Sequence, residues 1–285
     1  MNVELRPGSA ADAEPCGRIC FEAFAAIAGT HRFPPDFPDA GTAAGFIGSF
    51  LADPRVYSVV AEVDGRVVGS NFLSEHSPIA GVGPITIDPT VQDAAIGRVL
   101  MVDVLERARR EGHPGVRLVQ AAYHGRSLAL YAKLGFVVRE PLAAMQGQPP
   151  SRPGGSRLVR PATERDIDAA AALARRVHGF DRSAELAQAV GTGGATVVEH
   201  DDRITGYTTS IAFFGHACGE SNDDLKALIA AAPEFGGPGF LLPIRNAELF
   251  RWCLEQRLRV VQTMTLMSLG LYNEPQGVFL PSVLY

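Results

Sequence analysis

The sequence predicts an α/β chain that carries two copies of one fold. Strand-like and helix-like runs alternate through the first half, and Asp64-Gly65 joins two strand-like runs in the manner of a β-hairpin. Landmarks of the first half then return: Arg6-Pro7 before an alanine-rich helix reappears as Arg160-Pro161 before another. A repeat with such a long period implies two domains rather than a solenoid.

Length and composition set the outer limits. The chain has 285 residues and a formal charge of −5, without a run of basic residues, which argues against a nucleic-acid partner. It shows no apolar run of membrane-spanning length and no signal-peptide pattern, so we expect no membrane association and a cytoplasmic location. The four cysteines have neither C-x-x-C nor zinc spacing, so we expect buried thiols and no metal site.

The first elements follow from local signals. A short strand, Val3–Arg6, ends at Pro7-Gly8, and Ser9 can cap a helix that runs to about Ile27. Residues 29–39 are rich in proline and predict a loop, and a second helix is expected over 42–51. The hairpin strands cover 56–63 and 66–73.

The centre of the first half combines a strand, a turn and a helix. Ile85–Ile87 is strand-like and stops at Asp88-Pro89, and apolar residues at helical spacing follow Gly97. The small residues between them leave backbone N–H groups at the positive end of a helix dipole, which favours phosphate binding. A strand over 116–121, a helix over 127–134 and a strand-like run over 135–138 complete this half.

Two motifs in this half resemble those of the GCN5-related N-acetyltransferases. Gln92–Gly97, read as Q-x-x-A-x-G, is similar to the family's Q/R-x-x-G-x-G/A loop, with Ala95 in the place of the first glycine. His124–Phe136 is similar to N-x-x-A-x-x-L-Y-x-K-x-G-F, with His124 in the asparagine position and Ser127 in the alanine position. The order of strands and helices also matches. The resemblance implies a mixed, mostly antiparallel sheet flanked by helices.

The resemblance also implies a donor and a set of site residues. In the family the loop wraps the pyrophosphate of acetyl-coenzyme A (acetyl-CoA), the acyl donor, and the preceding strand pairs with the pantetheine amides. The expected binding residues are Ile85, Thr86, Ile87, Gln92, Asp93, Ala94, Ala95, Ile96, Gly97, Arg98, His124, Ser127 and Tyr131. Tyr131 is the expected catalytic acid, because a phenol stays protonated at neutral pH and can protonate the departing thiolate.

The general base stays open at this point. Glu75, His76, Glu22 and His31 are all candidates, acting directly or through water.

The second copy is expected to lack this chemistry. We expect domains at 1–146 and 157–285, joined by a linker at 147–156 that is rich in proline and glycine. Where the loop should recur, Glu220, Asp223 and Asp224 would repel a pyrophosphate, and Asn222 or Asp223 is expected to cap the helix that follows. By spacing, Cys253 stands in the position of Tyr131, and Arg257 in that of Gly135.

Two functions remain. The first is an N-acetyltransferase that acts on a primary amine of a small-molecule or peptide acceptor, as a monomer or homodimer. The second is a regulatory or structural protein that binds coenzyme A without turnover, which the changes at Ala95 and His124 would suit.

Overall fold

A computed structural model describes residues 2–91, 95–151 and 156–284 of the chain. Two compact units make it up: Met1–Leu118 with His124–Phe136, and Val119–Tyr123 with Val137–Tyr285. The domains expected from the sequence, 1–146 and 157–285, have different bounds because they were drawn from the repeat. They stay a prediction about which parts of the chain fold independently. Among the described residues, no helix is both long and apolar enough to cross a membrane.

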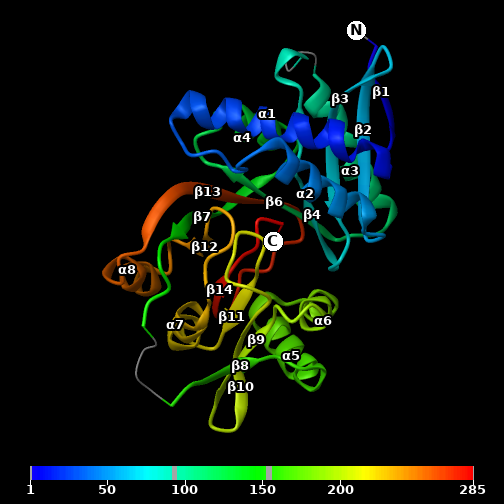
Figure 1. The fold of residues 1–285 in the computed structure, drawn as a ribbon. Helices are drawn as coiled ribbons and strands as arrows, with labels where there is room; N and C mark the ends of the chain where they lie inside the picture. The colour runs from blue at the N-terminus through cyan, green and yellow to red at the C-terminus, as the bar shows by residue number, and fades with distance from the viewer. Residues whose placement is uncertain (1, 92–94, 152–155, 285) are drawn as a thin grey trace. The chain divides into compact units, whose positions relative to one another are not determined.

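The first unit is a sheet with helices on both faces (Figure 1). Its elements in order are β1 (Glu4–Pro7), α1 (Ala13–His31), α2 (Ala40–Ala52), β2 (Val56–Val63), β3 (Arg66–Ser74), β4 (Ile79–Val82), β5 (Thr86–Ile87), α3 (Ile96–Arg110), the part of β6 (Gly115–Ala121) up to Leu118, and α4 (Gly125–Lys133). The strand order is β1-β2-β3-β4-β6, and β5 pairs with β3. All these pairs are antiparallel except β4 with β6, as the prediction of a mixed, mostly antiparallel sheet requires.

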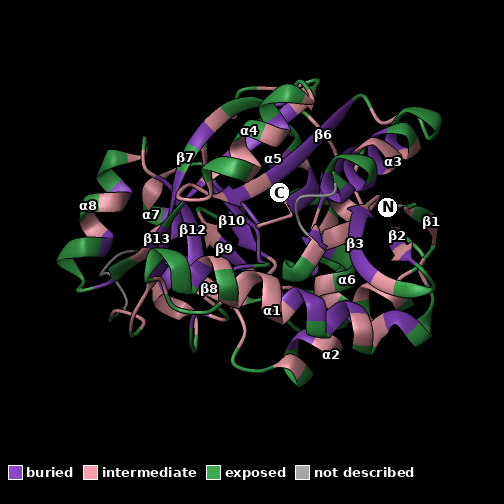
Figure 2. Cartoon of the chain, turned by 90° about the horizontal axis from the view of Figure 1, so that it is seen from above, coloured by how far each residue is buried: buried purple, intermediate pink, exposed green. Residues whose placement is uncertain are grey.

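Neighbouring residues of β3 show how the helices are divided between the two faces. Phe72 packs with Cys16 and Ile47, so α1 and α2 lie over its face. Asn71 points the other way, as alternation along a strand requires, and its amide donates to the Leu100 carbonyl of α3 at 3.3 Å. In Figure 2 most of β3 is coloured as buried, whereas α1 and α3 each carry both buried and exposed residues.

The second unit contains more sheet than the sequence predicts. Its elements are β7 (Val137–Gln146), β8 (Leu158–Pro161), α5 (Ile167–His178), α6 (Ser183–Gly191), β9 (Thr196–His200), β10 (Arg203–Thr208), β11 (Ala217–Gly219), α7 (Asn222–Ala231), β12 (Phe240–Pro243), α8 (Ala247–Glu255), β13 (Arg259–Gly270) and β14 (Val278–Leu280). One set of strands runs β14-β11-β10-β9-β8, and β7 lies between β13 and β12. Every one of these described pairs is antiparallel.

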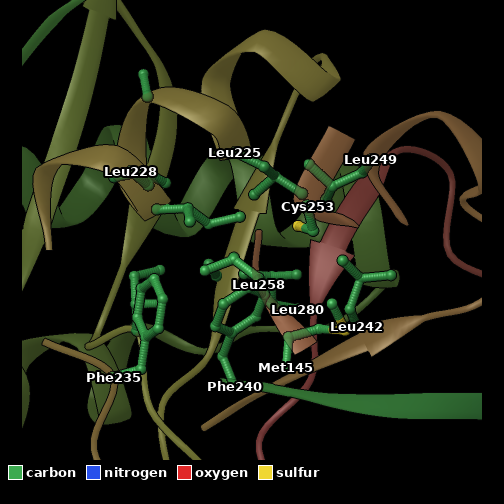
Figure 3. Packing of buried hydrophobic residues seen from close by; sticks show 14 of the residues in the cluster. Met145, Leu225, Leu228, Phe235, Phe240, Leu242, Leu249, Cys253, Leu258 and Leu280 are labelled. Atoms are coloured by element: carbon green, nitrogen blue, oxygen red, sulfur yellow. The ribbon is translucent and has the colours of Figure 1, made fainter. Parts of the chain in front are cut away.

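An apolar core holds this second unit together (Figure 3). Met145 of β7, Leu225 and Leu228 of α7, and Leu249 and Cys253 of α8 all lie in it. Cys253 is fully buried, as expected for the residue in the Tyr131 position. All four cysteines are buried free thiols, as predicted.

The predicted repeat is visible in ion-pair geometry. Arg6 donates to both carboxylate oxygens of Asp12, at 2.8 and 2.7 Å, and to Glu62 at 2.9 Å. Arg160 repeats this arrangement with Asp166, at 2.8 Å for both bonds, and with Glu199 at 3.0 Å. In both copies the aspartate completes a capping box at the start of the first helix.

The helices α4 and α8 also correspond residue by residue. His124 and Asn246 are the residues that precede them, and both helices have nine residues. Gly135 after α4 has a φ of +95°, and Arg257, its counterpart after α8, has a φ of +63°. The alignment made from spacing therefore matches two copies of one helix together with the turn that ends it.

Several sequence-based boundaries were wrong. Helix α1 continues to His31, four residues beyond the expected end, so the proline-rich loop is shorter. The strand β4 was not predicted, and β7 extends to Gln146 instead of ending at Val138. Helix α7 is capped by Ser221 rather than by Asn222 or Asp223, because Asp224 occupies the third helical position and bonds back to it.

Candidate functional site

The candidate site begins at an interruption in one strand of the first unit. Strand β4 pairs with β3 on one side and with β6 on the other, through Ile79–Gly81 and Gly115–Arg117. After a break at residues 83–85, β5 pairs with β3 alone among the described strands. The second edge of Thr86–Ile87 therefore presents backbone N–H and C=O groups that a ligand with amide groups can pair with.

The next segment is the predicted phosphate loop. Gln92, Asp93 and Ala94 lie outside the described residues. Ala95 precedes helix α3 with φ +59° and ψ 10°, in the left-handed region. The glycine that the family carries here is the residue best suited to that backbone, so alanine is a costly replacement at this position.

Helix α3 starts directly after Ala95. Gly97, in its first turn, has no side chain that would block an approaching ligand. The first N–H groups of a helix have no intrahelical acceptor and carry the positive end of the dipole. A Cβ added to Gly97 would lie 3.1 Å from Ile87 Cδ1 and 3.6 Å from Leu130 Cδ2. Gly97 thus marks the point at which β5, α3 and α4 meet.

Tyr131 follows Leu130 on α4 and is 6% exposed. Its ring packs against Phe136 with 6.1 Å between ring centroids. Burial raises the pKa of its phenol to about 12, while a hydrogen bond from the Ser127 side chain acts in the opposite direction. Tyr131 is therefore a protonated phenol at neutral pH, as its predicted role as an acid requires.

Ser127 and His124 stand one helical turn and two turns before Tyr131. The Ser127 hydroxyl lies 2.8 Å from His124 Nδ1. The pKa of His124 is lowered by burial first, and then by the positive charges of Arg126 and His31. His124 is consequently neutral at pH 7, and one of its ring nitrogens carries a proton.

The four candidate bases lie in different parts of the first unit. Glu75 accepts two bonds from Arg107, at 2.8 and 3.0 Å, and His76 Nε2 lies 2.8 Å from Asp53. Glu75 is six residues beyond Gly69, the partner of Ile87, which places it about 20 Å along β3 from β5. Glu75 and His76 therefore do not share a site with Tyr131.

The other two candidates differ. Glu22 forms an ion pair with Arg18 at 3.0 Å on the surface of α1. His31 ends α1, close enough to His124 for its charge to lower the pKa of that residue. The charge of His31 thus acts on the residue that precedes the Tyr131 helix.

Sequence reasoning missed two contributions to the site. The close approach of Gly97 to Ile87 depends on how α3 is docked on β5, and no local pattern reports this contact. The contact between the Ser127 hydroxyl and His124 Nδ1 was detectable, since residues three apart are neighbours at helical spacing.

The corresponding place in the second unit is closed. Only residues 220 and 221 separate β11 from α7, whereas residues 88–95 separate β5 from α3. The buried Asp224 carboxylate accepts from the Ser221 N–H and hydroxyl at 2.9 Å, and from Thr205 and Arg157 at 2.8 Å. A negative charge of the protein itself therefore occupies the helix start that would otherwise attract a phosphate. No group of three or more His, Cys, Asp and Glu in the described parts of either unit is arranged to hold a metal ion.

Comparisons with known proteins point to one family. Residues 23–136 match the model of the acetyltransferase (GNAT) family. A mycothiol acetyltransferase of Thermomonospora curvata is 36% identical over 92 residues, which are 32% of this chain and 31% of the relative. An IAA acetyltransferase of Azospirillum brasilense is 32% identical over 94 residues, 32% of this chain and 61% of the relative. The chain therefore matches about a third of the first relative's length and less than two thirds of the second's.

Solved structures agree on the fold over nearly the whole chain. A Pyrococcus horikoshii protein assigned as an acetyltransferase has a TM-score of 0.74 at 16% identity, covering 97% of this chain and 94% of its own. A tandem GNAT protein from the clavulanic acid biosynthesis pathway has a TM-score of 0.58 at 17% identity, covering 94% and 98%.

Proposed function

Because the chain belongs to the GCN5-related N-acetyltransferase superfamily, we propose that it transfers an acetyl group from acetyl-CoA to a primary amine of a small molecule or peptide. The observation that carries the proposal is Tyr131, a buried and protonated phenol on α4. The preceding residue, Leu130, lies beside the start of α3. This neighbourhood supports an acid and a pyrophosphate site in the same part of the first unit.

The residues of the first unit fit the donor. The open edge of β5 offers backbone groups to the pantetheine amides, and Ile85 stands in the break just before it. The pyrophosphate would lie at the start of α3, against Ile96, Gly97 and Arg98, with the loop 92–95 around it. His124 and Ser127 lie at the start of α4 and complete the predicted binding set.

The chemistry requires a neutral amine, a polarised carbonyl and a proton for the leaving thiolate. The amine attacks the thioester carbonyl, and a backbone N–H of the β5 segment can stabilise the oxyanion that forms. Tyr131 then protonates the sulfur as the carbon–sulfur bond breaks. The amine's surplus proton leaves through a base, for which Glu22 and His31 remain the candidates.

One observation favours the alternative, a protein that binds coenzyme A without turnover. Ala95 holds a left-handed backbone at the edge of the phosphate loop, where its methyl group destabilises the conformation that binding uses. A protein that no longer depends on rapid turnover could tolerate that cost. The two functions share the donor site and differ only in catalysis.

Two measurements separate these functions. Titration calorimetry with coenzyme A should give one site per chain, since Asp224 closes the corresponding place in the second unit. Release of free thiol from acetyl-CoA should then depend on an added amine, screened as a panel of primary amines. Tight donor binding without any amine-dependent release would favour the alternative, and two equivalent sites would contradict the assignment of the donor site.

A further inference from the structure

The chain segments on either side of α4 are both attached to one strand of the second copy, β13. In the sheet, β13 lies between the end of β6 and β7. Before α4, the Ala122 N–H donates to the Thr263 carbonyl of β13 at 3.0 Å. After α4, Val137 begins β7 directly opposite Ser268 of the same strand. The connection that contains α4 and Tyr131 therefore starts and ends on β13.

The spacing of these two attachments fits the helix between them. Thr263 and Ser268 are five residues apart on β13, which is about 17 Å along an antiparallel strand. Helix α4 has nine residues, so its length is about 14 Å. The chain can thus leave the edge of β13, form α4 and return to β13 with only a short turn at each end.

Both attached segments are built firmly into the second unit. One edge of β7 pairs with β13 and the other with β12, and Leu142–Met145 of β7 are fully buried. Val119 and Ala121 at the end of β6 pack against the apolar cluster that contains Leu266 of β13. The neighbours of α4 in the chain are thus held by a sheet and a core that the second copy supplies in large part.

The exact position of α4 matters for the proposed chemistry. A general acid acts only within hydrogen-bond reach of the atom that it protonates. A displacement of about 1 Å can lower turnover roughly 10²-fold. Tyr131 lies in the second half of α4, so its hydroxyl moves with the helix.

We propose that β13 is a positioning element for the acid Tyr131, and that this is what the second copy contributes to the reaction. The inference rests on the proposed function, which gives Tyr131 its role. The expected first domain, 1–146, contains α4 and both attached segments but lacks β13. Without β13 the Ala122 N–H loses its acceptor and one edge of β7 is unpaired. A second copy without a donor site of its own is therefore still required for turnover.

The first test cuts the full chain in its linker. A protease recognition sequence replaces residues 152–155, and cleavage then leaves β7 on one fragment and β13 on the other. We expect the two fragments to elute together at equal stoichiometry and to retain amine-dependent thiol release. The first fragment refolded alone from urea should show no release, and adding the second fragment should restore it. Fragments that separate without denaturant, or a first fragment with full turnover by itself, would overturn the proposal.

The second test measures hydrogen exchange and needs no turnover. In a strand, the N–H and C=O groups of one residue point to the same neighbour, so Thr263→Pro removes an N–H from the edge of β13 that faces Ala122. Amides of α4 should then exchange at least about five-fold faster, while α3 keeps its protection. The matched control is Leu158→Pro, at the exposed first residue of the edge strand β8, which should leave exchange in α4 unchanged.

These outcomes separate the proposal from the proposed function. Equal protection of α4 in Thr263→Pro and in the wild-type protein would overturn the role of β13. If Thr263→Pro does not fold, Ala122→Pro removes the donor from the other side of the same hydrogen bond and gives the same comparison. A wild-type protein without amine-dependent thiol release would contradict the proposed function, whereas the exchange data would still report whether β13 holds α4.

Discussion

At the scale of single residues, two non-glycine positions depart from the backbone conformations that L-residues favour. Ala95 and Arg257 both hold left-handed conformations, with φ of +59° and +63°. The family motif has glycine in the place of Ala95, and this chain has Gly135 at the first-copy position that matches Arg257. Both residues therefore carry a local conformational cost, but only Ala95 adjoins the candidate site.

Replacing either residue by glycine should stabilise the protein. Left-handed backbone costs an L-residue about 1–2 kcal/mol, and the extra freedom of unfolded glycine offsets part of this, so we expect Ala95→Gly and Arg257→Gly to gain about 0.5–1 kcal/mol each. Urea unfolding measures the gain. Ala95→Gly alone should also tighten coenzyme A binding.

The matched control is Ala26→Gly, an exposed position within helix α1. It should lose about 0.5–1 kcal/mol, because glycine within a helix has only the entropic penalty. A loss of stability in Ala95→Gly would show that its left-handed backbone is not the native one.

Tyr131 gives the second prediction at this scale. Tyr131→Phe keeps the ring and its packing against Phe136 but removes the hydroxyl. Turnover should fall about 10²- to 10⁴-fold, while coenzyme A affinity measured by calorimetry stays nearly constant. Unchanged turnover would make Tyr131 a core residue only. Loss of affinity alone would mean that its hydroxyl holds the donor.

At the scale of elements, the site depends on how β5, α3 and α4 converge at Gly97. A Cβ at this position would already press on the flexible end of Ile87. A longer side chain must instead leave towards the region where the pyrophosphate is proposed to lie.

Gly97→Glu should therefore weaken coenzyme A binding at least about ten-fold, since a carboxylate would face the diphosphate. Gly45→Glu adds the same charge on α2, where a Cβ meets nothing within 4 Å, and should leave affinity unchanged. Gly97→Ala, without charge, should have an intermediate effect. Circular dichroism confirms that each variant is folded. Equal affinities of the two glutamate variants would contradict the proposed position of the pyrophosphate.

The sequence predicted the elements that have strong local signals. The hairpin at Asp64-Gly65 and the helices α3 and α4 were found because turn residues and helical periodicity are encoded within each segment. The strand β4 was missed because it is only four residues long and all four are buried, so it shows no alternation of apolar and polar residues. Buried residues Leu142–Met145 extend β7 for a related reason, since both faces of that strand are covered.

The site was predictable in composition but not in geometry. The motif around Tyr131 identified the helix, and the spacing of Cys253 and Arg257 identified its counterpart. Which of four candidate bases stands near Tyr131 depends on contacts between segments far apart in the chain. Glu75 is tied to Arg107, 32 residues later, and no local pattern could show this ion pair.

At the scale of the whole molecule, the second unit contains buried titratable groups that take no part in the proposed reaction. His216 is 1% exposed, with Nε2 2.9 Å from His178 Nε2 and Nδ1 3.4 Å from the Tyr207 hydroxyl. Burial, followed by the nearby charges of Arg182 and His178, lowers the pKa of His216 well below its usual value. His216 thus stays neutral in the folded protein at mildly acidic pH, where the same residue in the unfolded chain is protonated.

This difference predicts how stability changes with pH. Below about pH 6.5 the unfolded chain binds a proton at residue 216 that the folded protein refuses, so the free energy of unfolding should fall as pH falls. The slope approaches about 1.4 kcal/mol per pH unit for one proton, and His124, whose pKa is also lowered, adds a contribution of the same sign. Asp12, with a pKa of about 2, loses its contribution only at more acidic pH.

Urea unfolding between pH 7 and pH 5 measures the slope. His216→Gln should reduce the slope by the part that His216 contributes, whatever the stability of this variant at pH 7. His124→Asn should remove the smaller part that His124 contributes. If His216→Gln left the slope unchanged, the histidine at position 216 would be protonated in the folded protein, and its buried contacts would need another arrangement of charge.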